Sequence, residues 1–166
     1  MPNLPPPSSV PPETILLRPM DAQDLPWVAH WERILQPQPW NLAQLQEELQ
    51  QTGWCCIAHT QHTQAIGYAI ARRLYDELHL LALGTCHNWQ RQGVARQLLH
   101  GLLQHARNTP TASLLLEVRA SNRPALTLYQ DMGFQFLYTR KSYYTLPSGS
   151  EDAFVLQREL SHATPV

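Results

Sequence analysis

Residues 89–106 read Trp-Gln-Arg-Gln-Gly-Val-Ala-Arg-Gln-Leu-Leu-His-Gly-Leu-Leu-Gln-His-Ala, and this stretch decides the fold expected for the chain. Its second half repeats leucine at the spacing of one helix face, namely Leu98, Leu99, Leu102 and Leu103. Such spacing predicts an amphipathic helix that packs on a core. The first half has no such periodicity and contains a glycine, which predicts a turn that leads into the helix.

The turn is suited to binding an anion. The first N–H groups of a helix lack intrahelical partners and lie at the positive end of its dipole. Gly93 and Ala95 keep large side chains away, so a pyrophosphate can approach the main chain, and Arg91 and Arg96 can add charge around it. A glycine near a helix start is common, so this pattern alone also fits an ordinary surface helix.

Length and composition predict one globular domain. The chain has 166 residues, of which 43% are hydrophobic, and this size allows a substantial core. A formal net charge of -1 gives no overall field that would attract nucleic acid or an anionic membrane. No apolar run reaches the ~20 residues of a membrane-spanning helix, and residues 1–7 do not resemble a signal peptide. We therefore expect a cytoplasmic protein.

Neither the cysteines nor the histidines predict a metal site. Cys55, Cys56 and Cys86 are odd in number and two are adjacent, which suits neither a disulfide framework nor a C-x-x-C pair. The eight histidines form no compact ligand pattern with them. We expect reduced cysteines that pack in the core, and no metal.

The chain divides into a leader at 1–13, a domain at 14–160 and a tail at 161–166. Six of the fourteen prolines lie in the leader, which predicts a flexible or polyproline-like segment: Pro2, Pro5, Pro6, Pro7, Pro11 and Pro12. Within the domain, apolar periodicity and Gly or Pro punctuation predict a mixed α/β sheet. Its strands are expected at 14–19, 54–59, 65–71, 77–83, 113–118, 134–144 and 152–160, and its helices at about 25–34, 41–53, 94–106 and 122–132.

Three details belong to this prediction. Asp21 or Asp24 is expected to cap the first helix. The strand at 77–83 has little polar alternation after His79, which is typical of a strand covered on both faces. Residues 146–150 are expected to form the loop of a C-terminal hairpin.

Several motifs resemble one family. The turn Gln90-x-x-Gly93-x-Ala95 after a strand resembles the acyl-CoA pyrophosphate motif of the GCN5-related N-acetyltransferases. Residues 116–122, Leu-Glu-Val-Arg-Ala-Ser-Asn, and residues 128–134, Leu-Tyr-Gln-Asp-Met-Gly-Phe, resemble one branch of it. That branch acetylates the N-terminal alanine of a small-subunit ribosomal protein. Pro39-Trp40, Tyr143-Tyr144 and Glu151-Asp152-Ala153 are further local matches, and the resemblance extends over residues 15–160.

The resemblance implies a fold and a set of binding residues. The fold is a mixed, mostly antiparallel sheet of about seven strands with four helices, splayed between its two central strands. Acetyl-CoA would be the co-substrate, held by Leu83, Gly84 and Thr85 at a strand end, by Asn122, and by the turn residues Arg91, Gln92, Gly93, Val94, Ala95 and Arg96. Trp40 and Tyr143 would contact the acceptor. Thr85-Cys86-His87 departs from the Val-Asp-Pro-like segment common in the family, which leaves the backbone donors intact but alters the loop.

Two residues are expected to move protons. Acetyl transfer from a thioester to an amine needs an unprotonated amine, a polarised carbonyl group and a proton for the departing thiolate. Glu117 ends an apolar strand, where partial burial favours proton uptake, and is the expected general base. The Tyr129 phenol, with an ordinary pKa of about 10, suits protonation of a thiolate and is the expected general acid. Without the resemblance, Glu117 would be a solvated or salt-bridged residue and Tyr129 a core residue.

The expected function is acetyl transfer to a protein N-terminus by direct transfer in a ternary complex. Acetylation of lysine side chains or of a small amine is the alternative within the enzyme class. A module that binds CoA or a peptide without transfer is the alternative from another class. Asp76 and Glu77 would attract a basic N-terminal peptide, although they also fit a polar turn. We expect a monomer with a protein N-terminus as partner, and no nucleic acid.

Overall fold

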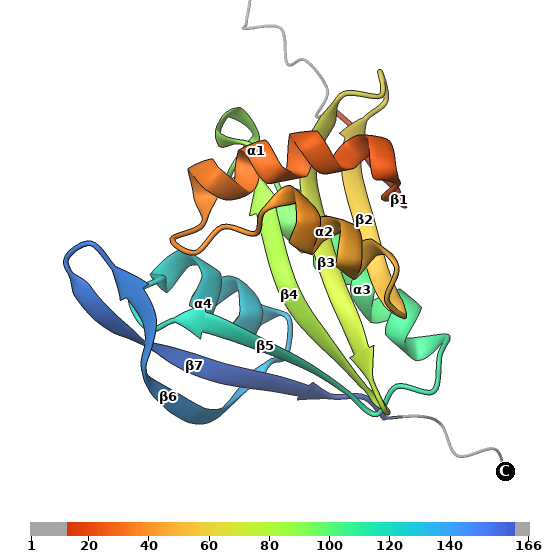
Figure 1. Cartoon of the computed structure of the whole chain (residues 1–166). Helices are drawn as coiled ribbons and strands as arrows, with labels where there is room; N and C mark the ends of the chain where they lie inside the picture. Colours follow the sequence, from red (N-terminus) through yellow and green to blue (C-terminus); the bar gives the residue numbers. More distant parts are fainter. Residues whose placement is uncertain (1–12, 162–166) are drawn as a thin grey trace, which may run out of the picture.

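The computed structural model describes residues 13–161 and contains one seven-stranded mixed sheet with helices on both faces (Figure 1). The strands are β1 (Ile15–Pro19), β2 (Gly53–Thr60), β3 (Ala65–Leu74), β4 (Glu77–Thr85), β5 (Ser113–Arg119), β6 (Gln135–Leu146) and β7 (Gly149–Glu159). The α-helices are α1 (Leu25–Leu35), α2 (Leu42–Leu49), α3 (Val94–Arg107) and α4 (Arg123–Asp131). Two 3-10 turns, η1 (Ala22–Asp24) and η2 (His87–Trp89), precede α1 and α3.

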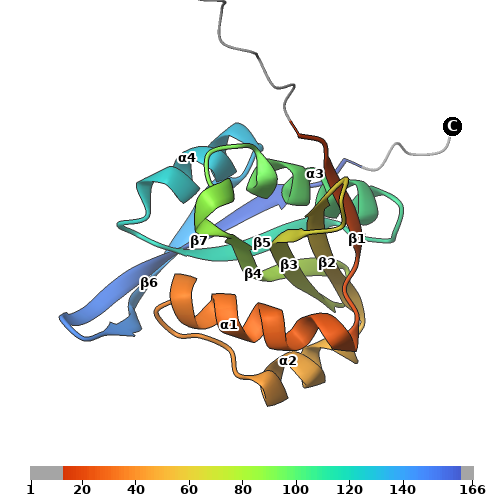
Figure 2. The same ribbon diagram turned by 90° about the horizontal axis from the view of Figure 1, so that it is seen from above.

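The sheet has the order β1-β2-β3-β4-β5-β7-β6, and its neighbouring strands are antiparallel except for β4 and β5. Parallel neighbours need a crossover connection, and helix α3 forms the one between β4 and β5. The view from above shows α1 and α2 on one face of the sheet and α3 and α4 on the other (Figure 2). The predicted mixed sheet of about seven strands with four helices is therefore confirmed.

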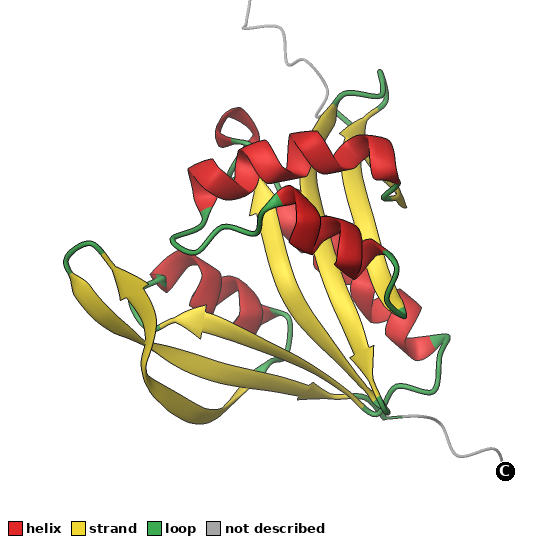
Figure 3. Ribbon diagram, in the orientation of Figure 1, coloured by secondary structure: helices red, strands yellow, loops and turns green. Residues whose placement is uncertain are grey.

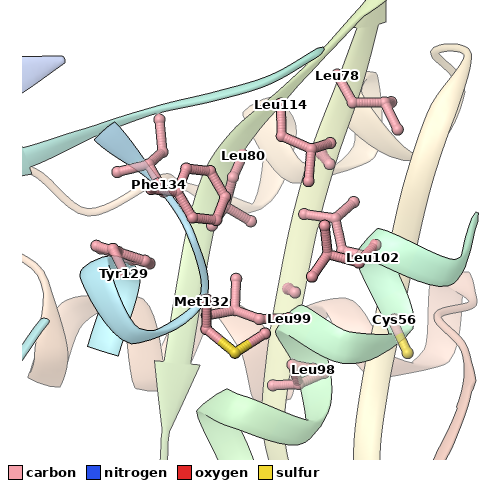
Figure 4. Close-up of a cluster of buried hydrophobic side chains, with 14 of the residues drawn as sticks. Cys56, Leu78, Leu80, Leu98, Leu99, Leu102, Leu114, Tyr129, Met132 and Phe134 are labelled. Carbon is pink, nitrogen blue, oxygen red and sulfur yellow. The ribbon is translucent and has the colours of Figure 1, made fainter. Parts of the chain in front are cut away.

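Each face of the sheet has its own apolar core. The larger core lies under α3 and α4, where Leu98, Leu99 and Leu102 of α3 pack with Leu80 of β4 and Leu114 of β5 (Figure 4). Each fully buried leucine contributes about 1.5 to 3 kcal/mol to folding. The smaller core joins α1 and α2 to the sheet through Met20, Leu25, Val28, Ala29, Leu45, Ile57, Tyr68, Ile70 and Ala82. The leucine repeat thus makes α3 the main support of the sheet.

Side-chain caps and one glycine explain where the helices lie. Asn41 accepts from the Gln44 N–H at 2.9 Å and begins α2, and Asn122 begins α4 in the same way. Asp21 caps the short helix η1, whereas Asp24 makes no cap bond to α1. The side-chain cap therefore lies at the start of η1, one turn before α1 begins. A Cβ atom on Gly101 would lie 2.5 Å from the end of the Leu17 side chain, so a larger residue there would force Leu17 to shift.

One prediction about the strands is wrong. The hairpin loop is shorter than expected, because β6 and β7 pair up to Leu146 and Gly149 and leave two residues between them. Strand β4 contributes Leu78 and Leu80 to the larger core and Ala82 to the smaller one, so it is covered on both faces as expected.

The predicted leader and tail lie outside the described residues, apart from Glu13 and Ser161. Across residues 13–161, no helix combines the length and the apolar character needed to cross a bilayer.

Candidate active site

The two central strands separate halfway along their length. Strands β4 and β5 pair only over Glu77–Leu80 and Ser113–Leu116. At that point β4 has a bulge, because Leu80 pairs with Ala71 and Ala82 with Ile70, which leaves Leu81 without a partner on β3. Beyond it the two strands diverge (Figure 3), and a cavity of about 920 Å³ is lined by both of them. The splay implied by the family resemblance is present.

The cavity brings together nearly all of the predicted site residues. Those that line it are Trp40, Leu83, Gly84, Thr85, Arg91, Gly93, Val94, Ala95, Arg96, Glu117, Asn122, Tyr129 and Tyr143. Gln92 is not among the lining residues, and its side-chain amide donates to the Asn88 carbonyl oxygen at 2.9 Å. Its side chain therefore stabilises the turn instead of facing the cavity.

The turn before α3 has the conformation that an anion site requires. Gly93 stands at the N-cap with φ 85° and offers no side-chain cap, so the first N–H groups of α3 stay free toward the cavity. Arg91 also adopts a positive φ, of 60°, and in the described part of the chain its guanidinium forms no ion pair. Three amides at a helix start with a free arginine beside them suit a pyrophosphate.

Arg96 lines the cavity and also contacts a second helix. Its guanidinium lies 3.3 Å from Asp131 and 3.7 Å from the Met132 sulfur, both at the end of α4. The side chain therefore ties α3 to α4, and its predicted contact with the pyrophosphate stays a prediction.

The open edge of β4 offers backbone groups to the cavity. The Cys86 N–H donates to Ile66 of β3, and because N–H groups alternate in direction along a strand, Gly84 also faces β3 while Leu83 and Thr85 face the opening. The carbonyl groups of Leu83 and Thr85 accept from side-chain amides rather than from a strand. Gly84 matters for another reason: a Cβ atom there would lie 2.4 Å from the Tyr68 ring.

Glu117 lies in a small polar cluster on the α1 and α2 side of the sheet. The Nε atom of Arg140 contacts its carboxylate at 3.1 Å. The Tyr143 phenol also hydrogen-bonds to Glu117, and this contact raises the pKa of Tyr143. A carboxylate that is 29% exposed and held by two side chains has a fixed position at the edge of the cavity.

An irregularity in β6 places Tyr143 in this cluster. Three residues of β6 lie between Arg140 and Tyr144, but only Asp152 of β7 lies between their partners, so β6 bulges outward. Ser142 has φ 51° within the bulge, and its N–H donates to Asp152 at 2.8 Å. This bond and Lys141 lower the pKa of Asp152, which therefore stays ionised and closes the bulge.

Tyr129 reaches the cavity from α4. It is 7% exposed, its ring packs against Phe134, and its hydroxyl makes no hydrogen bond to any described residue (Figure 4). Burial, together with the nearby Tyr144, raises the pKa of Tyr129, so the phenol keeps its proton. Tyr144 is electrostatically coupled to both Tyr129 and Glu117 and has a pKa raised to about 12, mainly by burial. Tyr144 also lines the cavity.

Asn122 begins α4 beside the cavity, and its side-chain oxygen accepts from the Ala125 N–H at 3.3 Å. Its amide nitrogen makes no bond to a described residue and remains available as a donor. The predicted contact of Asn122 with the cofactor arm stays a prediction.

Sequence reasoning missed a buried glutamate on the acceptor side. Glu32 is 1% exposed, lines the cavity and accepts from the Tyr68 hydroxyl at 2.7 Å and from the Trp40 N–H at 3.1 Å. Its burial raises its pKa. The sequence did carry a signal, because Glu32 continues the apolar helical spacing of Leu25, Val28 and Ala29.

No group of three or more His, Cys, Asp or Glu side chains within residues 13–161 is arranged to hold a metal ion.

The split sheet, with a helix start, a carboxylate and a phenol around the opening, is the arrangement that the family resemblance implied. The model of the acetyltransferase (GNAT) family matches residues 19–134. The chain is 32% identical over 142 residues to the ribosomal protein bS18-alanine N-acetyltransferase of Escherichia coli K12, which covers 86% of this chain and 95% of that protein. The chain belongs to the acetyltransferase (GNAT) family.

Two solved structures extend the comparison. The crystal structure of the ribosomal-protein-S18-alanine N-acetyltransferase from Escherichia coli has a TM-score of 0.84 and 30% identity, over 91% of this chain and 97% of that one. Arabidopsis thaliana NAA60 in complex with acetyl-CoA has a TM-score of 0.79 and 20% identity, over 89% and 99% of the two chains. The second likeness is one of fold.

Proposed function

We propose that this chain transfers the acetyl group of acetyl-CoA to the N-terminal alanine of a small-subunit ribosomal protein. The observation that carries the proposal is the opening between β4 and β5, where Glu117 and Tyr129 line one cavity with the start of α3. The bacterial relative that matches most of the chain is named for this reaction on protein bS18. A ribosomal acceptor agrees with the predicted cytoplasmic location, and the monomeric state stays a prediction.

The residues fit acetyl-CoA as co-substrate. The free amides of Val94, Ala95 and Arg96, with Arg91 beside them, would hold the pyrophosphate. The Leu83 and Thr85 groups at the open edge of β4 would hold the pantetheine arm and the thioester. The co-substrate supplies an activated acetyl group, and the protein supplies position and protons.

The protein would then manage two proton transfers. Glu117, directly or through a water molecule, takes a proton from the acceptor ammonium, and the free amine attacks the thioester carbonyl carbon. The carbon–sulfur bond breaks, the sulfur leaves with its electron pair, and the attacking nitrogen loses its second proton to water as the amide forms. Tyr129 gives its proton to that sulfur; burial raises the pKa of the phenol, which therefore carries its proton before the step. Arg140 and Tyr143 hold the Glu117 carboxylate at the edge of the cavity.

Thiol release tests the proposal. The protein is mixed with acetyl-CoA and one of three acceptors: a peptide that begins Ala-Arg, the same peptide with a blocked N-terminus and an internal lysine, or a small primary amine. We expect thiol release with the first acceptor only, and mass spectrometry should place the acetyl group on the alanine nitrogen.

The other outcomes select the alternatives. Release with the blocked peptide or with the small amine would replace the acceptor by a lysine side chain or a small molecule. Acetyl-CoA binding without thiol release from any acceptor would favour a binding module and contradict the proposal.

A further inference from the structure

The predicted thioester edge and the predicted acceptor loop are joined by buried hydrogen bonds. At the first end, Gln36 donates to the Leu83 carbonyl oxygen at 3.3 Å and also hydrogen-bonds to Tyr68. The Tyr68 hydroxyl donates to Glu32 at 2.7 Å. At the other end, the Trp40 N–H donates to Glu32 at 3.1 Å. We call Glu32, Gln36 and Tyr68, with the backbone groups of Leu83 and Trp40, the Glu32 network.

The two central residues of the network, Glu32 and Tyr68, are almost completely shielded from solvent. Tyr68 is 0% exposed and Glu32 is 1% exposed. Each oxygen of the Glu32 carboxylate accepts one of the two bonds, Oε1 from Tyr68 and Oε2 from Trp40. A buried polar group left without its partner is costly, so these bonds hold their geometry strongly.

The same residues touch both sides of the opening. The Tyr68 ring lies against Gly84, where any side chain would collide with it. Gln36 and Trp40 flank the segment between α1 and α2, and both line the cavity. The position of β4 near the thioester and that of the acceptor loop are therefore set by one group of bonds.

We infer that Glu32 is a positioning residue that fixes the distance between the acceptor loop and the strand end that holds the thioester. This inference rests on the proposed function for the identity of the two substrates. Glu32 acts through Tyr68 and Trp40 and does not touch the reacting atoms. Its removal should weaken productive acceptor binding more than acetyl-CoA binding, because α3 and its free amides are not part of the network.

The chain contains a matched control. Glu48 of α2 is 4% exposed and, like Glu32, ties a helix on this face to β3, here through Arg72 with an Nε–Oε2 distance of 3.1 Å. Neither Glu48 nor Arg72 lines the cavity. Glu48→Gln therefore breaks a buried helix-to-strand contact without disturbing the opening.

Steady-state kinetics with the Ala-Arg peptide is the first test. We expect Glu32→Gln and Tyr68→Phe each to raise the KM of the peptide about tenfold, as for the loss of a hydrogen bond to a charged group, and to change the KM of acetyl-CoA by less than about twofold. The double variant should also show about a tenfold rise, because both changes interrupt one connection. Glu48→Gln should lower the melting temperature and leave both KM values unchanged.

Unchanged peptide KM in both single variants, or an equal rise in Glu48→Gln, would overturn the inference. Hydrogen exchange supplies a readout that needs no turnover. Glu32→Gln should speed amide exchange in residues 36–41 and 83–86 together, whereas Glu48→Gln should not. If the wild-type protein fails to turn over the peptide, the proposed function fails. The hydrogen-exchange result alone then shows whether Glu32 links the loop at 36–41 to the strand end at 83–86.

Discussion

At the scale of single residues, the chemistry depends on one carboxylate and one phenol that approach the cavity from different elements. Glu117 comes from β5 and is held by Arg140 and Tyr143, whereas Tyr129 comes from α4 and is almost completely buried. Tyr144 interacts electrostatically with both. The two roles thus follow from two environments, one polar and one apolar.

Conservative substitutions test these roles. We expect Glu117→Gln and Tyr129→Phe each to lower kcat about 100-fold or more, because each removes one proton-transfer group. The melting temperature should change little, since neither substitution alters the shape of the side chain. Turnover of acetyl-CoA and the Ala-Arg peptide, with differential scanning calorimetry, measures both quantities.

Exposed residues outside the cavity provide the controls for these two variants. Glu159 lies at the end of β7, and Tyr75 lies in a turn with its side chain 97% exposed. The control variants are Glu159→Gln and Tyr75→Phe. Both should keep wild-type turnover. Wild-type turnover in Glu117→Gln and Tyr129→Phe as well would remove the proposed mechanism.

The sequence could identify Glu117 and Tyr129 because each lies in a short motif, but it could not identify the Glu32 network. The Tyr68 hydroxyl lies 36 residues along the chain from Glu32, and Gln36 lies 47 residues from Leu83. No local pattern encodes such contacts. The contact of the Arg96 side chain with Asp131 could not be predicted for the same reason, since Asp131 belongs to another helix.

At the scale of secondary structure, the path from β1 into α1 depends on an ion pair. The Arg18 guanidinium contacts Asp24 through two bonds of 2.8 and 2.7 Å, and Asp24 also accepts from the Asp21 N–H at 2.9 Å. The bonds from Arg18 are the main reason why the pKa of Asp24 is lowered from 3.8. The carboxylate thereby fixes the angle at which α1 leaves the sheet.

Asp24→Asn should lose stability in a pH-dependent way. A folded-state pKa below the unfolded value gives stability that is complete above the unfolded pKa and is lost as the pH falls through the folded pKa. We therefore expect the variant to be about 1 kcal/mol less stable than the wild type at about pH 7, because the pair is partly exposed. The difference should shrink as the pH falls below the ordinary value of 3.8.

Urea unfolding over a pH series measures this difference. Asp76→Asn is the control, because Asp76 is exposed and forms no ion pair with a described residue. A stability loss in Asp24→Asn that is the same at all pH values would contradict the assignment.

The strands show where prediction from sequence fails at this scale. The type of each strand and helix followed from apolar spacing, but the bulges at Leu81 and at Ser142 did not. The first requires knowledge of both neighbours of β4, and the second depends on Asp152, ten residues away from Ser142. Both bulges shape the cavity, so the site is less predictable than the fold.

At the scale of the whole molecule, ligand binding should stabilise the fold. The amides of α3, the open edge of β4 and the start of α4 line one cavity and belong to different parts of the sheet. Acetyl-CoA at about 100 times its Kd should add about 2.7 kcal/mol to the free energy of unfolding. For a chain of this size, that corresponds to a rise of about 5 to 10 °C in the melting temperature.

Thermal unfolding with and without acetyl-CoA checks this prediction. Gly93→Ala should show a smaller rise, because a Cβ atom is strained at φ 85° and the turn will not hold its amides in place. An equal rise in Gly93→Ala would place the binding site elsewhere, and no rise in the wild type would contradict acetyl-CoA as the ligand.

The parting of β4 and β5 also has a kinetic consequence. Residues of α3 and α4 line the cavity from one face of the sheet, and residues of α1 and β6 line it from the other. We expect a donor molecule beside α3 to leave the opposite side free for an amine. Neither substrate has to depart before its companion arrives, so double-reciprocal plots at several fixed concentrations of one substrate should intersect instead of running parallel.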